Sequence, residues 1–131
     1  MKRSRSQRSR GSNLIEAALV IPLLILLLIG VADLGRAFQV HITLLNAARE
    51  GARYAVRDSN PSAIAQRVVA EAALSHVALD PGMVSIVHAG AGNPVEVRVA
   101  YPYNLFVGHY IGLGALTIRA QATFRASGGG P

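Results

Sequence analysis

The sequence predicts an α+β protein in which one long N-terminal helix contains a transmembrane segment and leads into a short helix and a small antiparallel sheet. Three observations predict this fold class. They are an apolar run over residues 14–32, helix-compatible sequence that continues to Arg57, and alternation of apolar and polar residues in the last third of the chain. With 131 residues, 51% of them apolar, the chain is too apolar to be disordered and is long enough for one small domain beyond that helix.

The apolar run from Leu14 to Ala32 contains a single charged residue, Glu16. At about 1.5 Å per residue, a helix of this length reaches about 28 Å, which is close to the hydrocarbon thickness of a bilayer. Pro22 lies inside the run and predicts a mild bend. Because no stop signal follows Ala32, we predict one helix over residues 13–57, with its transmembrane segment at about 14–32.

The positive charge of the chain is concentrated in the leader formed by residues 1–12, which is predicted to be flexible. The leader supplies five positive charges of the net charge of +6. The rest of the chain has eight basic and seven acidic residues and is therefore almost neutral. A nucleic-acid-binding protein would keep a basic patch on its folded domain, so the charge pattern argues against that class. Basic residues beside a span stay in the cytoplasm, which predicts an N-terminus inside and a domain over residues 58–126 outside.

Chemistry-bearing residues are few. The chain has no cysteine, which excludes thiol catalysis, Cys-ligated zinc and iron–sulfur clusters. The four histidines fall on different predicted elements without ligand spacing, and no glycine-rich loop opens a helix after a strand. We therefore predict neither an enzyme nor a binder of metal, cofactor or small-molecule substrate.

Small residues form a stripe on the outer half of the long helix. Ala48, Gly51, Ala52 and Ala55 recur at the spacing of one helix face, which lets another element approach closely. Two interpretations stay open: the stripe packs against the chain's own domain, or it packs between subunits.

The C-terminal region alternates between short elements and turns. The sequence around Asn60 and Pro61 breaks the first helix and favours a second one, which we predict to end near Leu79. Further predictions are a turn at residues 80–82, strands beginning at Val84 and spanning 95–101 and 116–124, a hairpin-type loop at 90–94, a looser connection at 102–115 and a flexible tail at 127–131. Four aromatic residues are expected to cover the end of the core, with an exposed adhesive patch as the alternative: Tyr101, Tyr103, Phe106 and Tyr110.

The most informative motif is Gly11-Ser12-Asn13-Leu14-Ile15-Glu16, at the junction of leader and span. Glycine imposes no side chain on a backbone that must enter a protease in extended form. A charge carried to the bilayer centre costs about 2.5–3.5 kcal/mol, so Glu16 needs a cationic partner. A second interpretation is a capping box, with Asn13 as the N-cap and Glu16 bonding back to it.

Here the chain resembles type IV prepilins and their relatives. In those families a membrane aspartyl peptidase cuts after the glycine, and the glutamate at the fifth mature position is needed for assembly. The resemblance implies cleavage between Gly11 and Ser12 and an assembly role for Glu16, whose partner is the new amine of Ser12.

Three runs in order narrow the family: residues 14–24, the Asp33-Leu34-Gly35-Arg36 motif, and residues 46–55. They resemble the TadE-like family, the pseudopilins or minor pilins of tight-adherence (Flp-type) pilus machines. The resemblance implies a single-pass protein of the cytoplasmic membrane whose partners are the bilayer, a prepilin peptidase, other pilin or pseudopilin subunits and the assembly platform. One departure is Ala17, where this class usually has an aromatic residue.

Two alternatives remain from the sequence. The chain is an uncleaved single-pass membrane protein with an extracytoplasmic interaction domain, or a secreted soluble binding protein whose signal peptide ends near Ala32. The N-terminal residue of the mature protein distinguishes the three interpretations. A processed pseudopilin begins at Ser12, an uncleaved membrane protein keeps its leader, and a secreted protein begins at Asp33.

Overall fold

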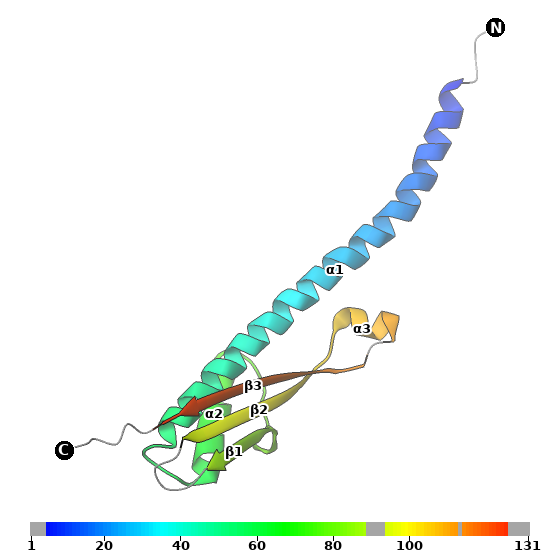
Figure 1. The fold of residues 1–131 in the computed structure, drawn as a ribbon. Helices are drawn as coiled ribbons and strands as arrows, with labels where there is room; N and C mark the ends of the chain where they lie inside the picture. Colours follow the sequence, from blue (N-terminus) through cyan, green and yellow to red (C-terminus); the bar gives the residue numbers. More distant parts are fainter. Residues whose placement is uncertain (1–4, 89–93, 113, 126–131) are drawn as a thin grey trace.

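The computed structural model describes residues 5–88, 94–112 and 114–125 and confirms the predicted α+β class (Figure 1). A long helix runs away from a small domain made of a shorter helix and a three-stranded antiparallel sheet. In chain order the elements are α1 (Arg5–Tyr54), α2 (Pro61–Leu74), the 3-10 helix η1 (Pro81–Met83), β1 (Val84–His88), β2 (Val95–Tyr103), α3 (Phe106–Ile111) and β3 (Leu116–Phe124).

Helix α1 is a single helix that starts earlier than predicted, at Arg5 rather than at residue 13. The leader from Arg5 onward is therefore helical. The physical reason is that its arginine, serine and glutamine residues are ordinary helix formers, and the lone Gly11 costs only about 1 kcal/mol relative to alanine. The helix continues through Pro22 as one gently curved rod (Figure 1). It ends at Tyr54, three residues before the predicted end, because the amide of Arg57 bonds the carbonyl of Tyr54 in a turn.

Helix α2 begins as the sequence predicts, with Pro61 in its first turn and the side chain of Asn60 accepting the amide of Ser62 at 3.0 Å. The predicted end near Leu79 is wrong, because α2 stops at Leu74. The carbonyls of Ala73 and Ala72 accept hydrogen bonds from the amides of the two residues that follow Ser75, His76 and Val77. His76 has a φ of +59°. This closing pattern turns the chain so that Val77 reaches the core.

The sheet has the order β1-β2-β3 with both pairs antiparallel. Strand β3 has the predicted bounds, and β2 runs two residues further than predicted, to Tyr103. Pro102 is tolerated there because β1 pairs only as far as Val99, so β2 has a single neighbour at that point. The predicted loop at 90–94 falls largely outside the described residues, and the predicted tail at 127–131 falls wholly outside them.

The predicted connection at 102–115 contains an element that the sequence did not indicate, the short helix α3. Tyr103 is buried in the core, as predicted. Phe106 is 62% exposed, so the prediction that it covers the core is wrong: α3 packs against α1 and directs this ring outward. The side chain of Tyr110 lies outside the described ones.

The hydrophobic core lies between one face of the sheet and the two longer helices, with α1 over β2 and β3 and α2 beside β1 (Figure 1). Residues of α1 supply a large share of it, so the folded unit is not confined to residues 58–126. The most buried core side chains from α1 are Leu44, Ala47, Ala48 and Ala52, and those facing them from α2 and β2 are Ile64, Val68, Ala72, Val97 and Val99.

Candidate functional site

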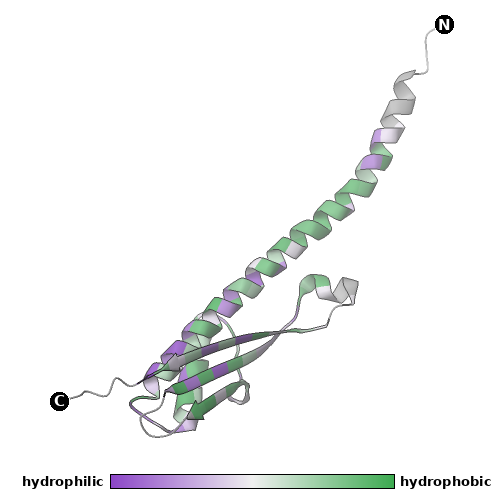
Figure 2. Ribbon diagram, in the orientation of Figure 1, coloured by the Kyte–Doolittle hydropathy of each residue, from purple (hydrophilic) through white to green (hydrophobic). Residues whose placement is uncertain are grey.

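The N-terminal half of α1 is an apolar rod whose residues 11–29 are all exposed within the part of the chain that the structure describes. Within the described residues it is the one helix long and apolar enough to cross a membrane, with a mean hydropathy of 2.8 over its most apolar window and none of that window buried. Leu19, Leu23 and Leu27 are each more than half exposed. Figure 2 shows the same stretch as a continuous hydrophobic band above the domain. A surface of this kind is stable in lipid and costly in water.

The predicted processing residues lie at the N-terminal end of this rod. Gly11, Ser12 and Glu16 are all on α1 and exposed, and no other part of the chain comes within 4 Å of where a Cβ of Gly11 would be. The capping-box interpretation is wrong for the intact chain, because α1 begins at Arg5 and Asn13 is inside the helix rather than at its N-cap. Glu16 therefore has no role in starting the helix while the leader is present.

The stripe of small residues packs inside the chain's own domain, which is the first of its two interpretations. Ala48, Gly51, Ala52 and Ala55 are all buried. A methyl group at Gly51 would overlap Cγ2 of Val68 on α2, and it would lie 3.7 Å from Val97 on β2. Gly51 thus sets the close approach of α1 to α2, and these residues are not available to a partner.

Next to the stripe, Glu50 connects the two helices. Its carboxylate bonds the Arg67 guanidinium of α2 at 3.0 Å and the Arg53 guanidinium one turn along α1 at 2.9 Å. The hydrogen bond from Arg67, reinforced by Arg53, lowers the pKa of Glu50 below its ordinary value. Glu50 is therefore ionised at neutral pH and holds α2 in register against α1.

A second connection, which the sequence analysis missed, joins α1 to α3. Asp33 is only 3% exposed, and its carboxylate accepts a hydrogen bond from the backbone amide of Val107 at 2.8 Å. One turn further, the Arg36 guanidinium lies 5.5 Å from the centre of the Phe106 ring. The signal in the sequence was an acid and a base three residues apart, directly after the apolar run, which places both on one helix face.

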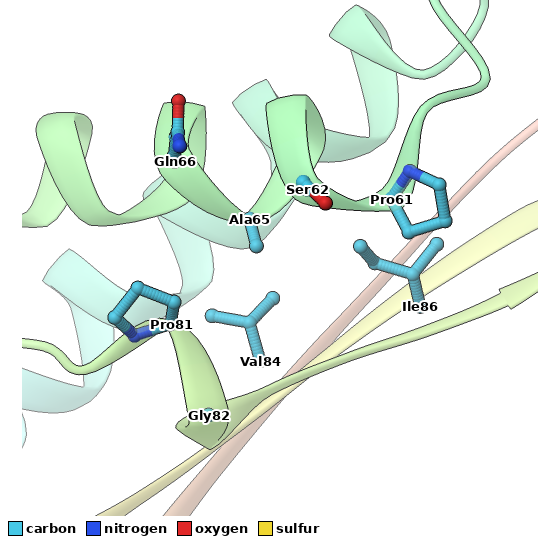
Figure 3. Close-up of a pocket in the computed structure, with 8 residues that line it drawn as sticks. All are labelled: Pro61, Ser62, Ala65, Gln66, Pro81, Gly82, Val84 and Ile86. Carbon is cyan, nitrogen blue, oxygen red and sulfur yellow. The ribbon is translucent and has the colours of Figure 1, made fainter.

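One hollow of the domain offers little chemistry. It is open, about 450 Å³ in volume, and lies between the start of α2, η1 and β1 (Figure 3). Its lining has no ionisable side chain: Pro61, Ser62, Ala65, Gln66, Pro81, Gly82, Val84 and Ile86. Among the side chains that the structure describes, no group of three or more histidine, aspartate or glutamate residues comes close enough together to hold a metal ion.

A comparison with protein families finds a match on the long helix α1. The family model of TadE-like proteins matches residues 11–53. Over these residues the chain is similar to TadE-like proteins. The matched segment begins at Gly11 and ends one residue before the end of α1. It contains the apolar run over residues 14–32, Asp33, Arg36 and every residue of the stripe except Ala55, and it excludes the sheet. The searches of curated proteins and of solved structures gave no match. A TadE-like segment that is also an apolar N-terminal helix fits a membrane protein associated with a Tad pilus.

Proposed function

We propose that this protein is a pseudopilin-like subunit of a tight-adherence (Flp-type) pilus machine, anchored in the cytoplasmic membrane by α1. The observation that carries the proposal is the division of the TadE-like helix. Its first half has an exposed apolar surface that nothing in the chain covers, whereas its second half is built into the domain core. The role is structural rather than catalytic.

In this proposal the leader stays in the cytoplasm and the domain lies outside. The five basic residues before Gly11 supply the charge bias. Gly11 and Ser12 are exposed, and among the described residues no packing atom lies within 4 Å of where a Cβ of Gly11 would be, so local helical hydrogen bonds must open for a membrane peptidase to take the backbone in extended form. The bond proposed to be cut joins Gly11 to Ser12.

Cleavage would change the environment of Glu16. The new amine at Ser12 lies four residues before Glu16, a spacing that places the two groups on one helix face. An ammonium and a carboxylate there can neutralise each other within one subunit, or Glu16 can bind the amine of a neighbouring subunit in lipid, where an unpaired charge is costly. Glu16 then acts in assembly rather than in capping.

Above the span, α1 keeps an apolar surface that the domain leaves uncovered. Leu34, Phe38 and Ile42 recur every four residues and are 69%, 66% and 43% exposed. This row continues the apolar rod upward, and we assign it to contact with the helices of other pilin or pseudopilin subunits. The buried stripe at Ala48–Ala55 has no part in that contact.

The N-terminal residue of the mature protein tests the proposal directly. Sequencing the N-terminus of protein isolated from the native membrane should give Ser12. Asp33 would indicate a secreted protein with a signal peptide, and an intact leader would indicate a permanent anchor; either result rejects the processed pseudopilin. A reporter fused after Arg125 should be active only if it functions outside the cytoplasm, and cytoplasmic activity would reject the topology.

A further inference from the structure

The short helix α3 presents an aromatic ring, that of Phe106, which is 62% exposed. Phe106 lies outside the hydrophobic core, and α1 is the element against which α3 packs. The sequence of α3 contains Phe, Val, Gly, His, Tyr and Ile, with no acidic residue and no lysine or arginine. A helix end of this composition is suited to an apolar or interfacial environment.

The position of α3 along α1 is fixed by two contacts. The Asp33 carboxylate accepts the Val107 amide at the start of α3, and the Arg36 guanidinium stacks over the Phe106 ring. Asp33 and Arg36 lie one turn apart on the same face of α1. The N-terminal end of α3 is therefore held beside α1 at the level of Asp33 (Figure 1).

That level coincides with the expected edge of the bilayer. The middle of the apolar run over residues 14–32 is Leu23, and Asp33 lies ten residues beyond it, or about 15 Å along the helix axis. Half of the hydrocarbon thickness is also about 15 Å. In Figure 2 the hydrophobic start of α3 lies alongside α1 just below the end of its hydrophobic band.

We infer that α3 is an interfacial anchor whose Phe106 ring enters the headgroup region of the outer leaflet, and that Asp33 is the positioning residue that sets its depth. The occupant of this surface is the lipid–water interface, since α3 is held beside α1 directly after the apolar run that is exposed for contact with lipid. Lipid anchoring at two points, α1 and α3, fixes the tilt of the domain above the membrane. The inference rests on the membrane anchoring of the proposed function, but not on processing or pilus assembly.

Tryptophan fluorescence of the full-length chain in vesicles of phosphatidylcholine and phosphatidylglycerol tests this depth. The chain has no tryptophan, so each single substitution reports alone. Phe106→Trp keeps an aromatic face for Arg36, and lipids brominated near the headgroup end of the acyl chain should quench it at least about twofold more than they quench Phe124→Trp. Phe124 is a partly exposed phenylalanine at the opposite end of β3 and serves as the matched control.

Leu23→Trp separates the two levels of the proposal. Its quenching should be strongest with bromines deep in the chains. If Leu23→Trp is quenched and Phe106→Trp is quenched no more than Phe124→Trp, the interfacial anchor is rejected while membrane anchoring stands. If Leu23→Trp is not quenched, both are rejected.

Substitution of Asp33 tests the positioning role. Combined with Phe106→Trp, Asp33→Ala removes the acceptor for the Val107 amide, and the quenching should fall towards the Phe124→Trp level. Asp33→Asn keeps a side-chain oxygen and should retain most of the quenching. Equal quenching in all three backgrounds would reject Asp33 as the residue that sets the depth of α3.

Discussion

Gly51 on α1 faces Val68 on α2 so closely that the two helices leave no room for a methyl group between them. Gly51→Ala should therefore destabilise the domain by up to about 2 kcal/mol, because overpacking costs about 1–3 kcal/mol and helix propensity returns only about 1 kcal/mol of it. Thermal unfolding of the full chain in detergent micelles, followed by circular dichroism, measures this change.

Two further variants make that measurement specific. Gly35→Ala, on the same helix with open space around it, should be neutral or stabilising by up to about 1 kcal/mol. In a double-mutant cycle, Val68→Ala should make Gly51→Ala less costly by at least about 1 kcal/mol. Additive effects of the two substitutions would contradict the close contact.

The ion pairs of Glu50 predict a pH dependence of stability. Arg67 and Arg53 lower its pKa in the folded state, so the unfolded chain binds more protons as the pH falls. The stabilisation is complete above the unfolded pKa of about 4.5 and is lost as the pH falls through the lower folded value. Because the Arg67 side chain is about half exposed, the effect should be only about 0.2–1 kcal/mol.

The measurement is the stability difference between the wild-type chain and Glu50→Gln as a function of pH. The difference should be present at neutral pH, disappear in acid and shrink as salt is added. Arg67→Met should remove most of it as well. A difference that persists unchanged in acid would mean that Glu50 stabilises the helix pair through something other than its charge.

His76 has a left-handed backbone conformation directly after α2. Glycine adopts this conformation without the penalty of about 1 kcal/mol that a side chain adds, so His76→Gly should stabilise the domain by about 0.5–1 kcal/mol. The side chain of His76 is exposed, so little packing is lost. His41→Gly, inside α1, is the control and should destabilise, by at least a few tenths of a kcal/mol from helix propensity alone. Equal effects at the two positions would contradict this account.

Glu16→Gln separates assembly from insertion. The substitution removes the charge while keeping the shape and helix propensity, so the protein should insert and be trimmed normally but fail to support pilus assembly. Immunoblots of membrane fractions and counts of pili measure the two outcomes. Normal pilus numbers would show that the charge of Glu16 is dispensable.

Gly11→Val should leave an untrimmed, membrane-embedded precursor, and normal trimming of that variant would remove the peptidase site from the proposal.

Local patterns in the sequence predicted the elements whose boundaries are set by neighbouring residues. Strand β3 was predicted with its observed bounds, because apolar and polar residues alternate through it without interruption. The start of α2 was predicted because Asn60 and Pro61 are residues with specific capping and first-turn roles. The end of α2 was not, since the residue in the left-handed position is a histidine and not the glycine that usually marks such an end.

Features that depend on distant residues could not be predicted in the same way. The contact between Asp33 and Val107 joins positions far apart in the chain, and nothing in the local sequence of either residue indicates the other. The stripe around Gly51 was visible as a pattern, but its partner became known only from the packing of α2 and β2 against it. The proposed processing site at Gly11 and Ser12 and the assembly role of Glu16 stay predictions from sequence.

Because α1 passes from the apolar rod into the domain core without a break, the two parts of the molecule share one axis and one rotational phase. Each residue of an α-helix adds about 100° of rotation and about 1.5 Å of rise. One residue inserted between Arg36 and Leu44 would therefore turn the sheet by about 100° relative to Glu16, and seven inserted residues, close to two full turns, would nearly restore the original angle. A tilt or rotation of the span is therefore passed on to the sheet through this one helix.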